Sequence, residues 1–316
     1  MQSLNARAGD AVVWLLLLTA PFWLPLTGGY TELGTEILVY ALAAMALNFL
    51  LGYTGVLSFG HAAYFGLGAY GTAVIMKYVY ESTPLAMAFG VVLGTAAAAI
   101  IGPLIVRLRG VYFAMCTIAF GQVFYFIAFQ WRDLTGGDDG LSAWHREPLH
   151  FGFATLDILN NGKALYFFTL AVFAVAVGIM AFLLRSPFGR TLLAIRENER
   201  RARFLGIPVD RHIWMSWVIS CAFVSLAGVM YALLNDFVDP RALRWDQSGN
   251  FVIMAVLGGM RSFWGPLLGA AIFIVLRDYI SSHTENWMSF VGLIFVIVVM
   301  FFPRGLLGMI RRRLTS

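Results

Sequence analysis

Charged side chains gather in one internal stretch of this 316-residue sequence, residues 185–211, which reads RSPFGRTLLAIRENERRARFLGIPVDR. Leu192, Leu193 and Ile195 form an apolar stripe among arginines and glutamates, so the first half of the stretch predicts a short amphipathic helix. Such a helix offers apolar contact and ion pairing to another surface, and it carries no pair of groups that makes or breaks bonds.

A second short helix is expected to start at Asn198. Its side chain can accept hydrogen bonds from the free amides of the first turn, and Glu199 suits the positive end of the helix dipole. Gly206 ends this helix and Pro208 prevents its continuation. Two amphipathic helices joined at a polar corner form a knob that suits docking into a groove on a soluble partner. The alternative is a basic loop that only fixes topology or touches anionic lipid. The predicted docking residues are Gly189, Arg190, Arg196, Glu197, Asn198, Arg201, Ala202, Leu205 and Gly206.

Glycines recur between residues 51 and 71, which read LGYTGVLSFGHAAYFGLGAYG. Small residues let helices approach closely in lipid, and the first three of these glycines permit a break before the next helix. Ser58 and His61 sit at that break, where an ionisable residue is a candidate for a transport path. The alternative for His61 is a neutral ring bonded to a neighbouring carbonyl. Asn48 and Gln122 are further polar residues in apolar segments, with helix packing as their alternative role.

A third glycine-rich run, residues 257–270, reads LGGMRSFWGPLLGA. Its turn lets two half-helices meet inside a membrane, and short segments interrupted by glycine point to a substrate path. Close helix packing is the alternative interpretation. The predicted path residues are Asn48, Gly55, Ser58, His61, Gln122, Gly258 and Gly259.

Paired acids stand in a glycine-rich turn within the hydrophilic segment 132–163. This turn is suited to bind a partner or to gate the mouth of a pore. The spacing of its acids is wrong for an EF-hand, so it does not predict a calcium loop. The residues of the turn are Thr135, Gly136, Gly137, Asp138, Asp139 and Gly140.

Motifs for catalysis or nucleotide binding are missing from this sequence. It contains no GxSxG, no HExxH, no paired carboxylates in an apolar segment and no GxxxxGK[ST] phosphate loop, so any ATP hydrolysis must come from a partner. Cys116 and Cys221 lie in apolar runs, where cysteine acts as a small hydrophobe, and we expect no cofactor and no metal site. A secondary transporter or channel would need ionisable residues in mid-span, for which only His61 qualifies. A membrane enzyme would need a catalytic cluster.

The elements that must position these residues are membrane-spanning helices. Hydrophobic residues make up 60% of the chain and charged residues 12%. This charged share is about half that of a soluble domain. We predict an all-α polytopic membrane protein with about ten crossings in one transmembrane domain, residues 1–316. The segment 249–260 is too short to cross alone, so it is either a half-helix or part of a tilted span. The predicted spans are 11–27, 34–51, 59–79, 84–106, 110–131, 164–184, 213–234, 249–260, 264–280 and 287–303.

The distribution of charge predicts that both termini lie in the cytoplasm. With ten crossings, 15 of the 22 basic residues fall on the cytoplasmic side, as the positive-inside rule expects. The first apolar segment is predicted to be a retained span rather than a removed signal peptide. Residues 185–212 are then the one sizeable cytoplasmic loop, and residues 132–163 are the outer loop. The basic net charge fits membrane topology rather than nucleic-acid binding. The cytoplasmic basic residues are Arg7, Arg107, Arg109, Arg185, Arg190, Arg196, Arg200, Arg201, Arg203, Arg211, Arg261, Arg304, Arg311, Arg312 and Arg313.

Five blocks of this sequence resemble the LivM-type permease subunits of branched-chain amino acid ABC importers. They are NFLLGYTGVLSFGHAAYFGLGAY at 48–70, TGGDDGL at 135–141, SPFGRTLLAIRENE at 186–199, LGGM at 257–260 and FPRGL at 302–306. The resemblance implies a bacterial inner-membrane protein that works with a LivH-like second permease, two cytoplasmic ATPases that bind the ATP, and a periplasmic binding protein.

The same resemblance implies roles for the two loops. Residues 186–206 would be the coupling element that docks on an ATPase, and residues 135–141 would face the binding protein. The family includes importers of leucine, isoleucine and valine, and others of urea, short amides and further amino acids or organic acids. Alternating access would follow when the coupling element moves.

Overall fold

The computed structural model describes residues 2–79, 82–142, 149–150, 155–156, 161–260, 262–284, 286–301 and 305. Its helices are α1 (Gln2–Trp23), α2 (Thr31–Thr54), α3 (His61–Val74), α4 (Thr83–Ile105), α5 (Val111–Gln130), α6 (Arg132–Thr135), α7 (Gly162–Arg185), α8 (Pro187–Glu197), α9 (Glu199–Phe204), α10 (Val209–Asn235), α11 (Trp245–Gly258), α12 (Gly265–Ser281) and α13 (Trp287–Phe301). Its strands are β1 (Leu141–Ser142), β2 (Leu149–His150), β3 (Thr155–Leu156) and β4 (Phe237–Val238).

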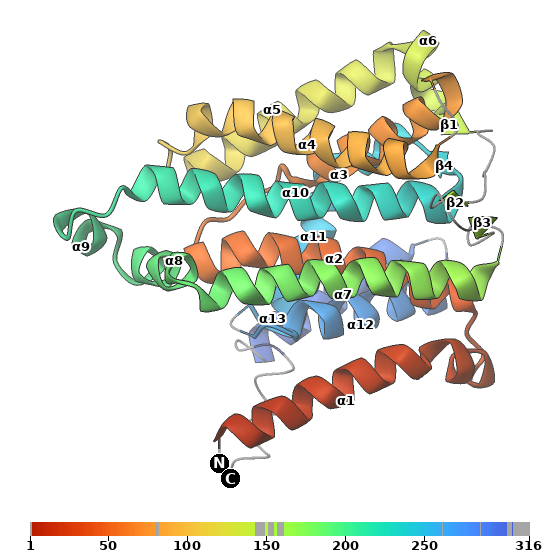
Figure 1. The fold of residues 1–316 in the computed structure, drawn as a ribbon, viewed down its shortest axis with the longest axis horizontal. Helices are drawn as coiled ribbons and strands as arrows, with labels where there is room; N and C mark the ends of the chain where they lie inside the picture. The colour runs from red at the N-terminus through yellow and green to blue at the C-terminus, as the bar shows by residue number, and fades with distance from the viewer. Residues whose placement is uncertain are drawn as a thin grey trace.

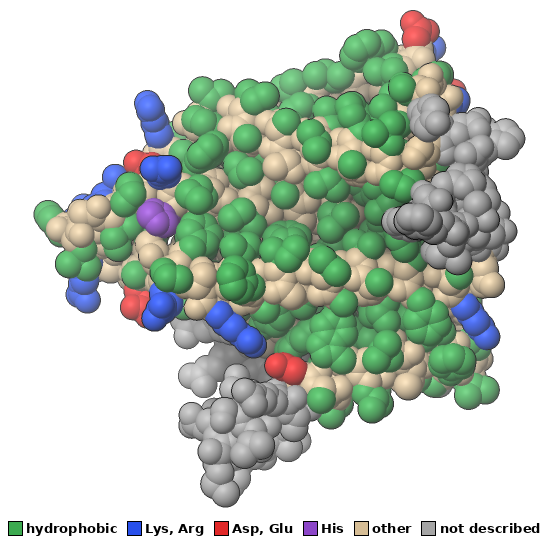
Figure 2. All heavy atoms as spheres, in the orientation of Figure 1, with side chains coloured by type: hydrophobic (Ala, Val, Ile, Leu, Met, Phe, Trp, Pro, Cys, Tyr) green, Lys and Arg blue, Asp and Glu red, His purple; other side chains and the backbone are tan. Residues whose placement is uncertain are grey.

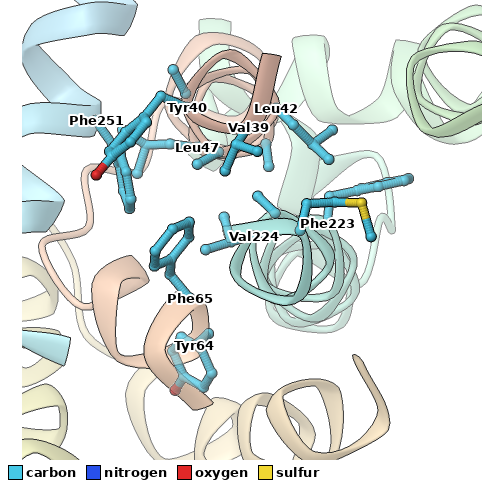
Figure 3. Packing of buried hydrophobic residues seen from close by; sticks show 14 of the residues in the cluster. Val39, Tyr40, Leu42, Leu47, Tyr64, Phe65, Phe223, Val224 and Phe251 are labelled. Carbon is cyan, nitrogen blue, oxygen red and sulfur yellow. The ribbon is translucent and has the colours of Figure 1, made fainter. Parts of the chain in front are cut away.

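The helix α10 forms the centre of the bundle, with α2, α3 and α4 packed around it (Figure 1). Figure 3 shows side chains of α2, including Leu42, against Val224 of α10, with Phe65 of α3 beside Phe251. The rings of Phe65 and Phe251 lie 5.4 Å apart between their centroids. The helix α1 lies at the edge of the bundle and contacts α7 and α2.

Small residues set the distance between α3 and α10. A methyl group built on Gly228 would lie 1.9 Å from the carbonyl oxygen of Phe65, and one built on Gly68 would lie 2.2 Å from the carbonyl oxygen of Ser225. The two backbones are therefore in direct contact. The helix α4 joins the same interface, because a methyl group on Gly94 would lie 2.0 Å from the Ser225 hydroxyl. Close approach of this kind is how helices associate where surrounding lipid is as apolar as their side chains.

The bundle has two distinct ends (Figure 1). The helices α8 and α9 project from one end, which we call the α8–α9 end, and arginine side chains cluster there (Figure 2). At the opposite β1–β4 end, β1 pairs antiparallel with β4, with Leu141 opposite Val238, and β2 pairs antiparallel with β3. Hydrophobic side chains cover the surface between the two ends (Figure 2).

Each of the ten predicted spans corresponds to a helix of the described chain, and the predicted helical membrane architecture is confirmed. Five helices, α2, α4, α5, α7 and α10, are long and apolar enough to cross a membrane. The number of crossings stays a prediction, and residues 302–303 of the last span lie outside the described residues. The four strands are two residues each, and no sequence pattern predicted them.

The eighth predicted segment is a short helix. This helix, α11, begins at Trp245, four residues earlier than expected. It has 14 residues and is therefore about 21 Å long at 1.5 Å per residue. This length is less than the ~30 Å hydrocarbon core of a bilayer. The turn Pro240–Leu243 precedes it and packs against α3, where a methyl group on Gly66 would lie 2.3 Å from Leu243. The choice between a half-helix and part of a tilted span stays a prediction, like the number of crossings.

The backbone contact between α3 and α10 yields a stability prediction. We expect Gly228→Ala to destabilise the folded protein by about 1–3 kcal/mol, because the added methyl group must push the Phe65 backbone away. Gly178→Ala in α7 is the matched control, since nothing lies within 4 Å of the added carbon. Thermal unfolding of the detergent-purified chain measures both variants. Equal stability of the two would contradict the packing described here.

Candidate translocation and coupling sites

The predicted break between the second and third spans is confirmed. The helix α2 ends at Thr54, and Gly55 has a φ of +80°. This is a left-handed conformation that favours glycine. Six residues after Gly55 the chain re-enters a helix at His61, which is fully buried. The free amide of Phe59 donates to the Thr117 hydroxyl at 3.2 Å, and that of Ala62 donates to the Ser248 hydroxyl at 2.8 Å.

Both ring nitrogens of His61 are hydrogen-bonded. Nε2 lies 2.8 Å from the Ser220 hydroxyl oxygen, and Nδ1 lies 2.9 Å from the Ser58 hydroxyl oxygen. The Ser220 hydroxyl donates to the carbonyl of Ala46, so it accepts from Nε2–H, and Nδ1 shares a hydrogen bond with the Ser58 hydroxyl. In this conformation the ring joins α3 to α10 and has no free nitrogen for a solute.

The structure brings the two predicted path segments together at Asn48. Its Nδ2 lies 3.4 Å from the carbonyl oxygen of Ser262, while its buried Oδ1 has no partner among the described residues. Close beside it, a methyl group on Gly52 would lie 2.4 Å from the carbonyl of Met260. The turn itself is tight, since Gly259 has a φ of +113° and a methyl group on Gly258 would lie 1.7 Å from the Gly265 carbonyl.

Arg196, predicted as a docking residue, turns toward the break. Its guanidinium donates to the carbonyl of Gly52 in the last turn of α2, where an arginine satisfies a free carbonyl and the negative end of the helix. Its side chain also fills the space beside Gly55, with Cγ 2.9 Å from where a methyl group on that glycine would lie. Arg196 is half-buried and connects α8 directly to the α2 terminus.

The predicted pair of short helices is confirmed, and the second helix has the predicted cap at Asn198. The Asn198 side chain accepts from the Arg201 amide at 2.9 Å, and α9 ends before Gly206, which has a φ of +81°. Phe204 and Leu205 at its end are 90% and 75% exposed, so the knob has an apolar tip. The predicted docking residues separate by exposure. Arg190, Glu197, Asn198, Arg201, Leu205 and Gly206 are exposed or half-exposed, and Gly189 and Ala202 are buried.

An ion-pair network holds the knob to the bundle. Arg109, in the turn between α4 and α5, pairs with Glu199 of α9 at 2.9 Å and with Asp210 of α10. Arg203 pairs with the same two acids at 3.0 and 2.8 Å. The groups are a third to a half exposed, so each pair alone contributes little, but the shared geometry fixes the orientation of α9. Sequence reasoning assigned these arginines to topology only, because their partners are far apart in the chain.

The predicted outer turn forms the β1–β4 end. Thr135 is buried and its hydroxyl accepts from the Gly137 amide at 3.3 Å, while Asp138 and Asp139 are exposed. Three glycines of the turn, at 136, 137 and 140, have positive φ. The residues 143–148, 151–154 and 157–160 of the outer loop lie outside the described residues.

Two cavities open beside this turn, and both are lined by Asp239 and Arg241. One has a volume of about 390 Å³ and also contacts Asp138, and the other has about 190 Å³ and extends to Tyr40 and Tyr231. The predicted path residue Gln122 is half-buried, and its Nε2 has no partner among the described residues. Sequence reasoning missed Asp239 and Arg241. Their signal was the alternation of acids and bases between two apolar segments, 236–246.

Comparison with known proteins finds relatives over nearly the whole chain. It is 27% identical to the high-affinity branched-chain amino acid transport system permease protein LivM of Escherichia coli K12, covering 96% of this chain and 76% of the relative. It is 22% identical to the probable LivM of Methanocaldococcus jannaschii, covering 85% and 90%. The LivH permease of Escherichia coli K12 is 26% identical, covering 85% and 91%. No solved structure gives a significant match.

A family model described as the permease component of the branched-chain amino acid transport system matches residues 29–299. This range contains the break at Gly55, the knob and the glycine turn at Gly258. The related proteins are permease subunits rather than enzymes, and the apolar helices make this a multi-pass membrane protein. The chain belongs to the family of branched-chain amino acid transport permeases.

Proposed function

We propose that this chain forms half of the pore of an ATP-binding-cassette importer for branched-chain amino acids or related small polar solutes. Separate ATPase subunits that bind the ATP drive it, a LivH-like permease completes the pore, and a binding protein supplies the substrate. The observation that carries the proposal is the two-sided knob. One side exposes an apolar tip at Phe204 and Leu205, and the other side holds the end of α2 through Arg196.

The proposed coupling runs through that second side. An ATPase that grips the tip and moves would pull on α8, and Arg196 would transmit the movement to the Gly52 carbonyl beside the break. The network of Arg109, Glu199 and Asp210 gives α10 a second attachment to the knob. Two central helices would therefore shift together, which is the movement that alternating access requires.

The proposed topology has ten crossings, with both termini in the cytoplasm of a bacterial inner membrane. Its support is that segments assigned to one side contact each other. At the α8–α9 end, the Trp264 indole donates to Asp10 of α1 at 2.7 Å, and Arg109 reaches α9. At the other end, Lys77 donates to the Ser142 carbonyl at 3.1 Å. That end, with the turn at Thr135–Gly140, would receive the binding protein.

The first prediction concerns the tip. Phe204 and Leu205 expose apolar area that an ATPase can cover. Replacing both by serine should weaken ATPase binding by about 2 kcal/mol, the size of an interface hot spot. ATP hydrolysis by the reconstituted complex, stimulated by loaded binding protein, measures the effect. Arg200→Ser, at an exposed site of the same helix, is the control. Full stimulation in the double variant would show that the tip is not the docking surface.

The second prediction concerns Arg196. We expect Arg196→Ala to leave the ATPases bound and hydrolysing but to lower uptake per ATP about tenfold, because the carbonyl of Gly52 loses its partner on α8. Arg190→Ala, which changes an exposed arginine of the same helix, should keep the ratio of uptake to hydrolysis near the wild-type value. A parallel loss of hydrolysis and uptake in Arg196→Ala would assign the residue to docking instead.

The third prediction tests the path residues. Gly55→Leu forces a side chain into a left-handed conformation against Arg196, and His61→Ala leaves two buried hydroxyl groups without their ring partner. We expect both to reduce uptake in proteoliposomes strongly. Unchanged uptake in both would remove the break from the path. Uptake by this chain alone, without ATP or partner, would overturn the permease-subunit function in favour of a secondary transporter or channel.

A further inference from the structure

The two cavities at the β1–β4 end share one pair of opposite charges. Asp239 and Arg241 line both the cavity of about 390 Å³ and the cavity of about 190 Å³. The residues stand two apart in the turn between α10 and α11, which is seated against α3 through the buried Leu243. Their backbone positions are therefore set by the bundle rather than by a free loop.

This pair is distinguished from its charged neighbours by the lack of an ion-pair partner. Arg244 pairs with Asp246 at 3.1 Å, and Arg277 pairs with Glu36 at 2.5 Å. Within the part of the chain that the structure describes, neither Asp239 nor Arg241 takes part in an ion pair. Burial raises the pKa of the Asp239 carboxyl, although Arg241, Arg244 and the backbone amides of Ala242 and Arg241 favour its charged form, so burial outweighs the compensation that the protein supplies. An approaching cation would add to this compensation.

Aromatic side chains form the wall of the smaller cavity. Tyr40 of α2, Phe65 of α3 and Tyr231 of α10 line it, and the ring centroids of Phe65 and Tyr231 lie 5.2 Å apart. Tyr40 lies 6.1 Å from Phe65 and 6.3 Å from Tyr231. Such a wall accepts an aliphatic group on its surface and attracts an ammonium group over a ring face. Ligand sites combine an apolar wall with a few fixed polar groups in this way.

An α-amino acid presents a carboxylate, an ammonium and a side chain on one carbon atom. Arginine recognises a carboxylate through parallel N–H donors, and a carboxylate of the protein recognises an ammonium. A guanidinium and a carboxylate without ion-pair partners, with an aromatic wall around the same space, match these three groups. A solute with a single charge, or an uncharged amide, would leave Asp239 or Arg241 without a partner.

We infer that Asp239 and Arg241 form a recognition site for the zwitterion of an aliphatic α-amino acid, at the mouth of the pore. Arg241 binds the carboxylate, Asp239 binds the ammonium, and Tyr40, Phe65 and Tyr231 receive the side chain. This inference rests on the proposed function, since it names the substrate class of the same pore. It assigns selectivity to the permease itself, in addition to the binding protein.

Equilibrium binding of radiolabelled L-leucine to the purified full complex, without binding protein and without ATP, tests the site. Unlabelled 4-methylpentanoate lacks the ammonium, and 3-methylbutylamine lacks the carboxylate. In the wild type each analogue should compete for the site at least about tenfold more weakly than unlabelled leucine does. Asp239→Asn should lower the affinity for leucine about tenfold and leave the affinity for 4-methylpentanoate unchanged. Arg241→Gln should lower the affinity for leucine and leave the affinity for 3-methylbutylamine unchanged. A tenfold change corresponds to about 1.4 kcal/mol, less than the loss of a buried charged partner usually costs.

Glu32→Gln and Lys163→Gln are the matched controls, because both are exposed charges at the same end of the bundle and line neither cavity. A dissociation constant of ~1 mM corresponds to a binding free energy of about −4.1 kcal/mol. If the wild type binds no leucine at concentrations up to about 10 mM, the inference is overturned. Equal losses for leucine and both analogues in the two variants would also overturn it. ATP-driven uptake of the same preparations separates the two proposals. Normal uptake with no charge-specific binding refutes only this site, and charge-specific binding without ATP-driven uptake refutes only the importer.

Discussion

The need to satisfy free backbone groups inside the bundle determines how the rest of the structure is arranged. Breaking a helix between Gly55 and Gly60 frees amides and carbonyls that lipid cannot satisfy. Side chains of four other helices form hydrogen bonds at this break. Thr117 of α5 and Ser248 of α11 accept from the break, and Arg196 of α8 donates to it. Ser220 of α10 accepts from His61, so the break is the point at which the bundle is joined.

This arrangement joins the knob formed by α8 and α9 to the break after α2. A helix end that depends on Arg196 cannot be separated from α8, and α8 carries the exposed tip only a short distance along the chain. The glycine turn at Gly258 meets the same helix end through Met260 and Ser262. Elements that are far apart in the sequence therefore meet at the same helix end.

Local signals made part of the structure predictable. The break at Gly55, the cap at Asn198 and the end at Gly206 depend on the preference of single residues, and apolar runs located the helices. The start of α11 was not predictable, because the polar residues before Gly249 resemble a loop. In the structure Ser248 is buried in the bundle and accepts a hydrogen bond from the Ala62 amide. The partners of His61 and the charges around the cavities at the β1–β4 end could not be predicted either. They depend on contacts between distant segments, and a loop charge looks the same whether it faces water or a cavity.

The backbone contacts at Gly68, Gly94 and Gly228 have a mechanical consequence. Helices without a layer of side chains between them cannot slide or repack by small steps, so α3, α4 and α10 behave as one stiff lever. Asp210 and Tyr231 lie near opposite ends of α10, roughly 32 Å apart at about 1.5 Å per residue. A tilt of about 5° at the Asp210 end would carry Tyr231 by roughly 3 Å over that length, about the diameter of a water molecule. Such a lever would turn a slight rotation at the α8–α9 end into a displacement of about one water diameter at the other end of α10.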